Sequence, residues 1–217
     1  MNKRLVVFGG SGGLGKPLCD KLKNDYNVIP LSSKDVDVTN FQEVKDFFQS
    51  ETDIGIVVNF SGYNYNTVLH KYDGDNIQIK KQIKVNIEGN LNILSNCLSG
   101  MREDGYGRII LTSSIMSTKP AFGTGVYSGC KAFIDNLVKT CSVENLSKGI
   151  TCNSLQLGYM DGGLTYEVPE PFRTKVKNNI PLKRWGKISE IENAVRYLID
   201  TEYVSGCSLK INGGLDF

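Results

Sequence analysis

Short apolar runs alternate with longer amphipathic stretches along the whole chain. The runs are rich in β-branched residues and almost continuously hydrophobic, which is typical of strands covered on both faces. Strands are therefore expected at residues 4–8, 27–31, 54–60, 108–113, 150–157 and 208–211. Helical patterns fill the intervals, and we expect helices at residues 13–24, 41–49, 76–102, 127–147 and 188–200.

The helical stretches carry their own start signals and faces. Thr39-Asn40 and Ser189 are candidate N-caps, because their side chains can accept hydrogen bonds from the first free backbone N–H groups. The longest stretch has apolar residues at spacings of three and four, which predict one buried stripe. This stripe consists of Ile83, Ile87, Leu91, Leu94, Leu98 and Met101.

The alternation of strands and helices predicts an α/β fold. We expect residues 1–217 to form a single Rossmann-fold domain, a doubly wound parallel sheet of six to seven strands with helices on both faces. Only "SSK" separates the second strand from "DVDVT" (35–39), whereas a parallel crossover needs a dozen or more residues. The usual helix after the second strand is thus expected to be missing, and any third strand to be short and at the sheet edge.

Composition narrows the range of functions. The net charge of +2, from 25 basic and 23 acidic residues, gives no reason to expect a nucleic acid or an anionic membrane as partner. No apolar run approaches the ~20 residues of a membrane span. Six scattered cysteines and a single histidine, His70 in a polar stretch, argue against a zinc site and for buried, packing cysteines. The N-terminal "MNKRLVVFGG" is typical of a first strand, so a reducing, cytoplasmic setting is expected.

Two motifs carry candidate chemistry. "FGGSGGLG" (8–15) joins the first strand to the first helix, where glycines let the backbone approach a phosphate at the helix N-terminus. "YSGCK" (127–131) places Tyr127 and Lys131 one helical turn apart. Alone, such a pair is more often an accident of the surface than the acid of an enzyme. The ends of the strands are where a ligand of this fold binds.

The spacing of these motifs resembles that of the short-chain dehydrogenase/reductase family, and the resemblance covers almost the whole chain. "NFSG" (59–62) is similar to the family's N-N-A-G motif, "KVNIEGN" contains its helix asparagine, and "LTSSI" its active serine. The C-terminal "IPLKRWGKISEIENAVRYL" and "SGCSLKINGG" resemble the 3-oxoacyl-carrier-protein reductase branch. The sequence departs from the family at Phe8, at Leu157 before Gly158, and at Gly162, where relatives have threonine, proline and threonine.

The resemblance implies specific roles. The catalytic residues would be Asn86, Ser114, Tyr127 and Lys131. Tyr127 would be the general acid in reduction, Ser114 would bind the substrate oxygen, and Lys131 would lower the pKa of the tyrosine and hold the nicotinamide ribose. The dinucleotide would contact Gly9, Ser11, Gly12, Gly13, Leu14, Gly15, Ser32, Ser33, Asp37, Val38, Asn59, Ser61, Gly62, Tyr127, Lys131, Gly158 and Met160.

The end of the second strand bears on the choice of cofactor. Ser32, Ser33 and Lys34 take the place of the acid that would bind an adenosine ribose, so hydroxyls and an ammonium favour the 2′-phosphate of NADP(H), with NAD(H) as the alternative. Asp37 is the nearby acid that opposes this choice.

A small carbonyl or alcohol substrate would lie under a lid at residues 159–180. The pocket is expected to be formed by Met116, Thr118, Phe122, Tyr159, Leu164 and Tyr166. Relatives of this kind form dimers or tetramers through their long helices, so a homo-oligomer is expected. A reductase of sugar or nucleotide-sugar carbonyls and a non-catalytic NADP-sensing regulator are the alternatives. The first usually has a larger C-terminal domain, and the second usually lacks the tyrosine or lysine.

Overall fold

Six parallel strands form one sheet in the computed structural model, which describes residues 3–216. The strands are β1 (Arg4–Phe8), β2 (Val28–Leu31), β3 (Ile54–Asn59), β4 (Gly107–Ser114), β5 (Ile150–Leu157) and β6 (Ser208–Ile211). Their order is β2-β1-β3-β4-β5-β6. All six predicted strands are confirmed within a residue or two, and the domain is the predicted α/β fold with a parallel sheet.

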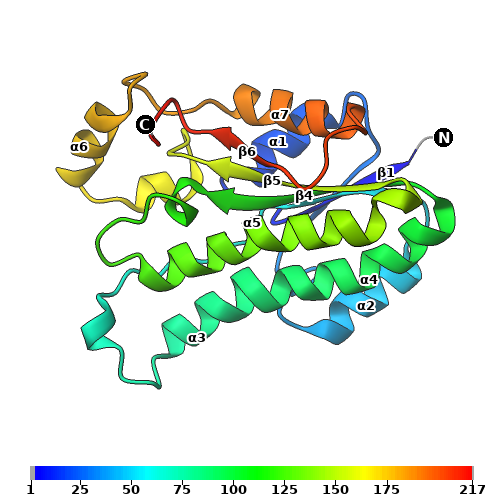
Figure 1. Ribbon diagram of the computed structural model, residues 1–217, viewed down its shortest axis with the longest axis horizontal. Helices are drawn as coiled ribbons and strands as arrows, with labels where there is room; N and C mark the ends of the chain where they lie inside the picture. Colours follow the sequence, from blue (N-terminus) through cyan, green and yellow to red (C-terminus); the bar gives the residue numbers. More distant parts are fainter. Residues whose placement is uncertain (1–2, 217) are drawn as a thin grey trace.

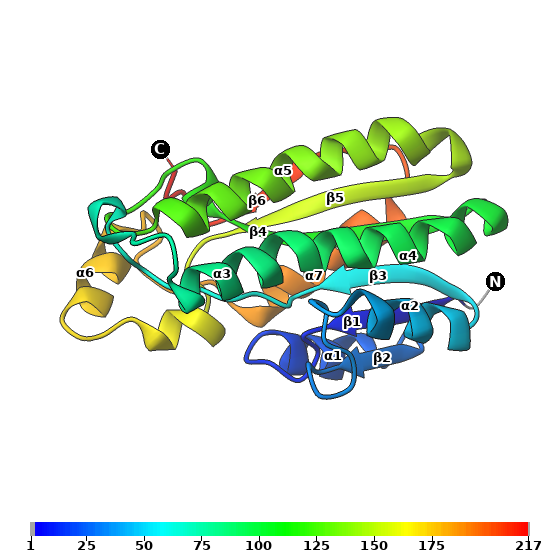
Figure 2. The same ribbon diagram turned by 90° about the horizontal axis from the view of Figure 1, so that it is seen from below.

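Helices cover both faces of the sheet (Figure 1). α1 (Gly15–Leu22) and α7 (Ile188–Asp200) lie on one face. α2 (Phe41–Ser50), α3 (Ile77–Ile83), α4 (Gly89–Asp104) and α5 (Gly125–Asn145) lie on the other, and α6 (Phe172–Asn179) lies beyond the carboxyl ends of the strands (Figures 1 and 2). Two apolar cores result, one on each face. Within residues 3–216, no helix is long and apolar enough to cross a membrane.

The region after β2 differs from the predicted short third strand. Residues 35–39 form turns, and no described residue between β2 and α2 is in a strand, so β2 itself is the edge of the sheet. The chain passes from β2 through α2 directly to β3, on the far side of β1. Asn40 caps α2 as predicted, since its side chain accepts hydrogen bonds from the N–H groups of Gln42 and Glu43. Residues 32–53 thus make one complete crossover.

The predicted long helix at 76–102 is not regular, and its buried face is confirmed only in its second half, at Leu94, Leu98 and Met101. A π-helical turn at Lys84–Glu88 separates α3 from α4. The buried residues are Ile79, Gln82, Asn86, Asn90, Ile93, Leu94, Cys97 and Met101, whereas Ile83 and Leu91 are exposed. The chain buries three amide side chains along this face, which a search for apolar residues does not find.

Three smaller predictions have different outcomes. Ser189 is not the cap of α7, because the helix already begins at Ile188 and Glu190 accepts a hydrogen bond from the Lys187 N–H at 2.7 Å. The burial of cysteines is confirmed for five of the six, and Cys207 is half-buried. His70 is exposed, as predicted, in a 3-10 turn at Leu69–Lys71.

Candidate active site

A crevice opens where the strand order reverses, between the carboxyl ends of β1 and β3. Gly9 follows β1 with a φ of +73°, and a Cβ atom there would lie 2.7 Å from the backbone nitrogen of Ser61, just beyond β3. A Cβ at Gly15 would lie 2.1 Å from the Gly9 carbonyl oxygen. Only glycine allows these approaches, so the two loops can form a cradle of backbone atoms for a phosphate-containing ligand.

Ser114, Tyr127 and Lys131 line a single cavity with this glycine loop. Ser114 ends β4, and its Oγ accepts a hydrogen bond from the Met116 N–H at 3.2 Å, which begins the 3-10 turn Ile115–Ser117. Tyr127 and Lys131 lie on the first two turns of α5, with the Lys131 Nζ 5.6 Å from the centre of the tyrosine ring. The Tyr127 hydroxyl is hydrogen-bonded to Ser114. The structure therefore brings three of the predicted catalytic side chains together.

Asn86 lies behind Lys131 in the π-helical turn. Its Nδ2 donates to the carbonyls of Tyr63 at 2.7 Å and Gln82 at 2.9 Å. Its Oδ1 is buried without a hydrogen-bond partner among the described residues. A Cβ on Gly62 would lie 3.5 Å from this Oδ1 and 3.8 Å from the Lys131 Nζ, so both polar atoms face Gly62. An acceptor, the Asn86 Oδ1, and a donor, the Lys131 Nζ, thus lie at one glycine, and together they fit a ligand hydroxyl or a water better than an apolar group.

The pKa of Tyr127 differs from the prediction. Burial raises it to about 12, and the hydrogen bond from Ser114 only partly opposes this effect. The Lys131 Nζ, which was predicted to lower this pKa, donates to the Thr112 carbonyl at 2.8 Å and lies 5.6 Å from the centre of the phenol ring. Burial lowers the pKa of Lys131 itself to about 8. Tyr127 is accordingly a protonated hydroxyl at neutral pH, which is the form that a proton donor needs, although the raised pKa makes it a weaker acid than a free tyrosine.

The cavity has a volume of about 530 Å³ and extends from the glycine loop to an apolar mouth. Of the predicted cofactor contacts, Gly9, Gly12, Gly13, Leu14, Gly15, Ser61, Gly62, Tyr127, Lys131, Gly158 and Met160 line it. Of the predicted substrate contacts, Met116, Phe122, Tyr159 and Leu164 line it, but Thr118 and Tyr166 do not. Ser11 is exposed and does not line the cavity. Asn59 does not line it either, but its Oδ1 accepts hydrogen bonds from the N–H and Oγ of Ser61, which does.

The predicted lid is folded over this cavity. It contains a 3-10 turn at Gly163–Glu167 and α6, and Glu167, Val168 and Phe172 line the mouth, although the sequence did not single them out. These residues belong to a stretch without hydrophobic periodicity. Their position in the predicted lid was therefore the only feature of the sequence that could have indicated a contact with the cavity. A Cβ on Gly13 would lie 2.8 Å from the Gly163 nitrogen, so the lid reaches the glycine loop itself.

The residues predicted to contact the adenosine lie apart from this cavity, at the end of β2. Ser32 donates from both its N–H and its Oγ to the Asp35 carboxylate, at 2.8 and 2.6 Å. Ser33 and Lys34 are exposed, and the Asp37 carboxylate is bonded to Thr39. Val38 is buried. Asp35 was missed; the Ser-x-x-Asp spacing of a hydrogen-bonded turn was its only signal.

A doubly wound sheet with a glycine turn at its switch point and a serine, tyrosine and lysine in the adjoining cavity defines the class of Rossmann-fold oxidoreductases. Comparison with known families agrees with this geometry. The model described as "Enoyl-(Acyl carrier protein) reductase" matches residues 11–216. The chain belongs to the short-chain dehydrogenase/reductase family, and it is an enzyme of the oxidoreductase class.

Individual relatives align with the chain over nearly its full length. Nodulation protein G of Azospirillum brasilense is 30% identical over 244 residues, covering 99% of this chain and 98% of that protein. Acetoacetyl-CoA reductase of Rhizobium meliloti is 30% identical over 242 residues, covering all of both chains. The 3-oxoacyl-[acyl-carrier-protein] reductase FabG of Rickettsia felis is 24% identical over 217 residues, covering 99% of this chain and 87% of that protein.

Proposed function

We propose that the protein is an NADP(H)-dependent reductase of 3-oxoacyl thioesters. The observation that carries this proposal is the continuous cavity from the glycine loop, past Ser114, Tyr127 and Lys131, to an apolar mouth at Phe122, Leu164 and Phe172. Such a mouth suits an acyl chain better than the hydroxyl-rich surface of a sugar. The printed names of the relatives, acetoacetyl-CoA reductase and 3-oxoacyl-[acyl-carrier-protein] reductase, support the same class of substrate.

The residues of the cavity can share the work of carbonyl reduction. When bound, a nicotinamide dinucleotide supplies the hydride that is added to the carbonyl carbon. Tyr127, which is protonated at neutral pH, gives its proton to the carbonyl oxygen, and a hydroxyl product results. Ser114 is hydrogen-bonded to Tyr127 and orients the same oxygen. Lys131 and Asn86 present an ammonium and a free amide oxygen at Gly62, which fit ribose hydroxyls or a relay water.

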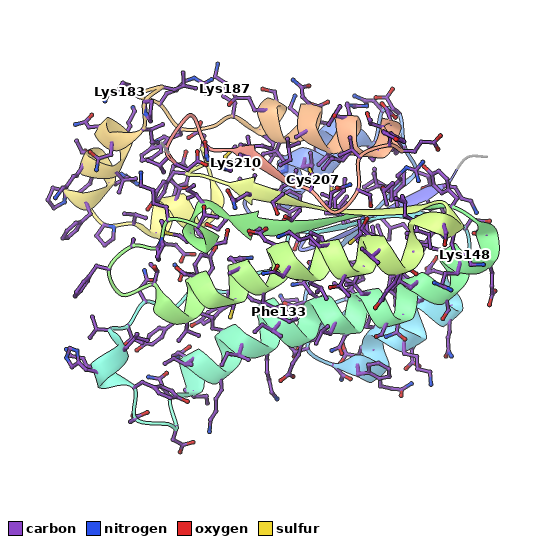
Figure 3. The ribbon with its side chains drawn as sticks, in the orientation of Figure 1. Phe133, Lys148, Lys183, Lys187, Cys207 and Lys210 are labelled. Carbon is purple, nitrogen blue, oxygen red and sulfur yellow. The ribbon has the colours of Figure 1, made fainter. Side chains whose placement is uncertain are left out.

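A cationic surface next to the mouth supports an anionic acyl carrier. Residues 172–187 contain six basic residues and no acidic one. Arg173 is paired with Glu170, and Arg184 with Glu190, so the unbalanced charge lies on the lysines of this segment. Figure 3 shows Lys183 and Lys187 between α6 and α7. Coenzyme A and acyl carrier proteins both carry negative charge, and such a surface would steer either toward the mouth.

A substrate panel tests the proposal. The full chain is assayed for NADPH oxidation with acetoacetyl-CoA, a 3-oxoacyl carrier-protein thioester and a sugar ketone. We expect turnover with the thioesters and a KM that rises with ionic strength. Tyr127→Phe should lose turnover but bind NADPH as tightly as wild type, whereas Tyr72→Phe, a half-exposed control, should keep both. Binding of NADPH without reduction of any carbonyl would favour the regulator instead.

The exposed helix faces support a homo-oligomer. Ile83 on α3, Leu91 on α4, and Val143 on α5 are apolar and exposed, with 85% of Val143 accessible. α3, α4 and α5 lie along one side of the molecule (Figure 2). We infer that a second copy covers this side. Light scattering should report a dimer or tetramer, and Leu91→Lys with Val143→Lys should shift it to the monomer; a monomeric wild type would contradict the inference.

A further inference from the structure

A buried carboxylate lies one helical turn beyond Lys131. Asp135 is only 8% exposed, and it follows Lys131 by four positions on α5. Residues at this spacing on a helix face each other, with Cβ atoms roughly 5–6 Å apart. Lys131 is only 3% exposed, so an acidic and a basic side chain are both buried within one turn of the same helix. A buried charge without a partner is costly, which makes their proximity significant.

The hydrogen-bond donors around Asp135 are neutral. Ser117 donates to its Oδ2 at 2.5 Å, and Ser154 donates to its Oδ1 at 2.7 Å. The Gln156 Nε2 donates to Oδ2 at 3.2 Å and to the Ser117 Oγ at 2.9 Å. Ser154 also contacts Ser208 of β6 at 3.0 Å. These bonds hold the carboxylate in place, but none of them supplies a positive charge.

The same carboxylate joins three parts of the site. Ser117 closes the 3-10 turn that begins directly after Ser114, Ser154 and Gln156 lie on one face of β5, and Asp135 lies on α5. Lys131 in turn faces the Thr112 carbonyl of β4 and the ring of Tyr127, and it interacts electrostatically with Cys130 and Asp135. Asp135 is the carboxylic acid in this set, whereas Cys130 carries a thiol.

We propose that Asp135 is a positioning residue that keeps Lys131 protonated and fixes the turn carrying Ser114. Its negative charge opposes the effect of burial on Lys131, because it stabilises the ammonium form. Its hydrogen bonds to Ser117 and to β5 hold α5 at a set distance from the serine turn. The consequence for catalysis rests on the proposed function, whereas the consequence for the charge of Lys131 does not.

The direct test is a titration of Lys131 in the full chain. NMR monitors the lysine side chains, which are labelled at Cε, and the signal of Lys131 is identified by its absence in Lys131→Met. We expect Asp135→Asn to lower the titration midpoint of Lys131 by roughly one to two pH units, from the interaction of two charges at this spacing in a protein interior. Glu144→Gln removes an exposed charge from the same helix and should leave the midpoint unchanged. If Asp135→Asn does not fold, Asp135→Ser, which leaves room for a water among the same donors, carries the same expectation.

An activity measurement adds a second readout. With a thioester substrate, the alkaline fall of kcat/KM should move to lower pH in Asp135→Asn by the same amount as the NMR midpoint, because neutral Lys131 no longer supports the reaction. If Asp135 had a purely structural role, Asp135→Asn would lower kcat/KM without moving the pH at which kcat/KM falls on the alkaline side. The inference is overturned if Asp135→Asn leaves the Lys131 midpoint where it is in wild type, or if Glu144→Gln moves it equally. A shifted midpoint in a protein that reduces no thioester would instead refute the proposed function alone.

Discussion

Alanine at Gly9 should loosen the crevice between β1 and β3. Gly9 has a left-handed φ of +73°, and an added Cβ would lie 2.7 Å from the Ser61 nitrogen and 2.8 Å from the Phe60 carbonyl carbon. The left-handed conformation costs an L-residue ~1–2 kcal/mol. The overlap falls on backbone atoms that cannot rotate away, which adds ~1–3 kcal/mol. We therefore expect Gly9→Ala to lower the free energy of unfolding by about 3 kcal/mol, or roughly 6–12 °C in Tm for a domain of this size.

Two other glycines separate these contributions. Gly74 has a φ of +82° but nothing within 4 Å of an added Cβ, so Gly74→Ala should cost only the ~1–2 kcal/mol of the backbone conformation. Gly100 lies in α4 with equally open surroundings, and Gly100→Ala should stabilise the chain by ~0.5–1 kcal/mol. Urea unfolding followed by circular dichroism gives the three values. NADPH fluorescence should show weaker binding in Gly9→Ala alone. A Gly9→Ala protein as stable as Gly74→Ala would refute the argument from the close approach.

Three further predictions concern other contacts. Arg108 is buried and donates to the carbonyls of Ile199 and Gly149, so Arg108→Ala should lower the free energy of unfolding by ~2–4 kcal/mol in urea; a loss under ~1 kcal/mol would contradict this role. The pKa of Lys131 is lowered to about 8 from an ordinary 10.5, so between these pH values the native state binds fewer protons than the unfolded chain. The free energy of unfolding of the wild type, relative to that of Lys131→Met, should therefore rise with pH across this window. A difference that stays constant with pH would contradict the lowered pKa. Asp35→Asn should strengthen NADPH binding several-fold more than NADH binding in fluorescence titrations, and equal changes would remove Asp35 from cofactor selection.

The sheet could be predicted from the sequence because its strands are apolar on both faces, a signal that needs no knowledge of the neighbours. The helix faces could not be predicted equally well. The buried side of α3 and α4 contains Gln82, Asn86 and Asn90. The amide groups of Asn86 and Asn90 donate to backbone carbonyls, as Asn90 does to the Asn86 carbonyl at 2.8 Å, and the Gln82 Oε1 accepts a hydrogen bond from the Tyr65 N–H. Burial of such polar groups depends on their hydrogen-bond partners, so a pattern of apolar residues finds the buried face at Leu94 and Met101 but misses it around Gln82 and Asn86.

In the candidate site, too, some residues could be predicted from the sequence and others could not. The glycine loop, Ser114, Tyr127 and Lys131 have fixed spacing within single elements, and the fold places them in one cavity. Asp35 and Asp135 were missed, because their importance comes from what they contact: Ser32 in one case, and Ser117 and β5 in the other. The raised pKa of Tyr127 likewise depends on burial by residues from several elements, and a pair of sequence positions cannot reveal it.

The loss of the third strand leaves β2 as an open edge, and this edge is protected by a proline. Hydrogen bonds from Leu5 to the Asn27 carbonyl and from Gly10 to the Leu31 carbonyl show that odd-numbered residues of this segment face β1. Pro30 therefore turns its nitrogen outward, where a strand of another molecule would need an N–H donor. The crossover at residues 32–53 places no further strand beside β2, and Pro30 keeps the exposed edge from templating aggregation.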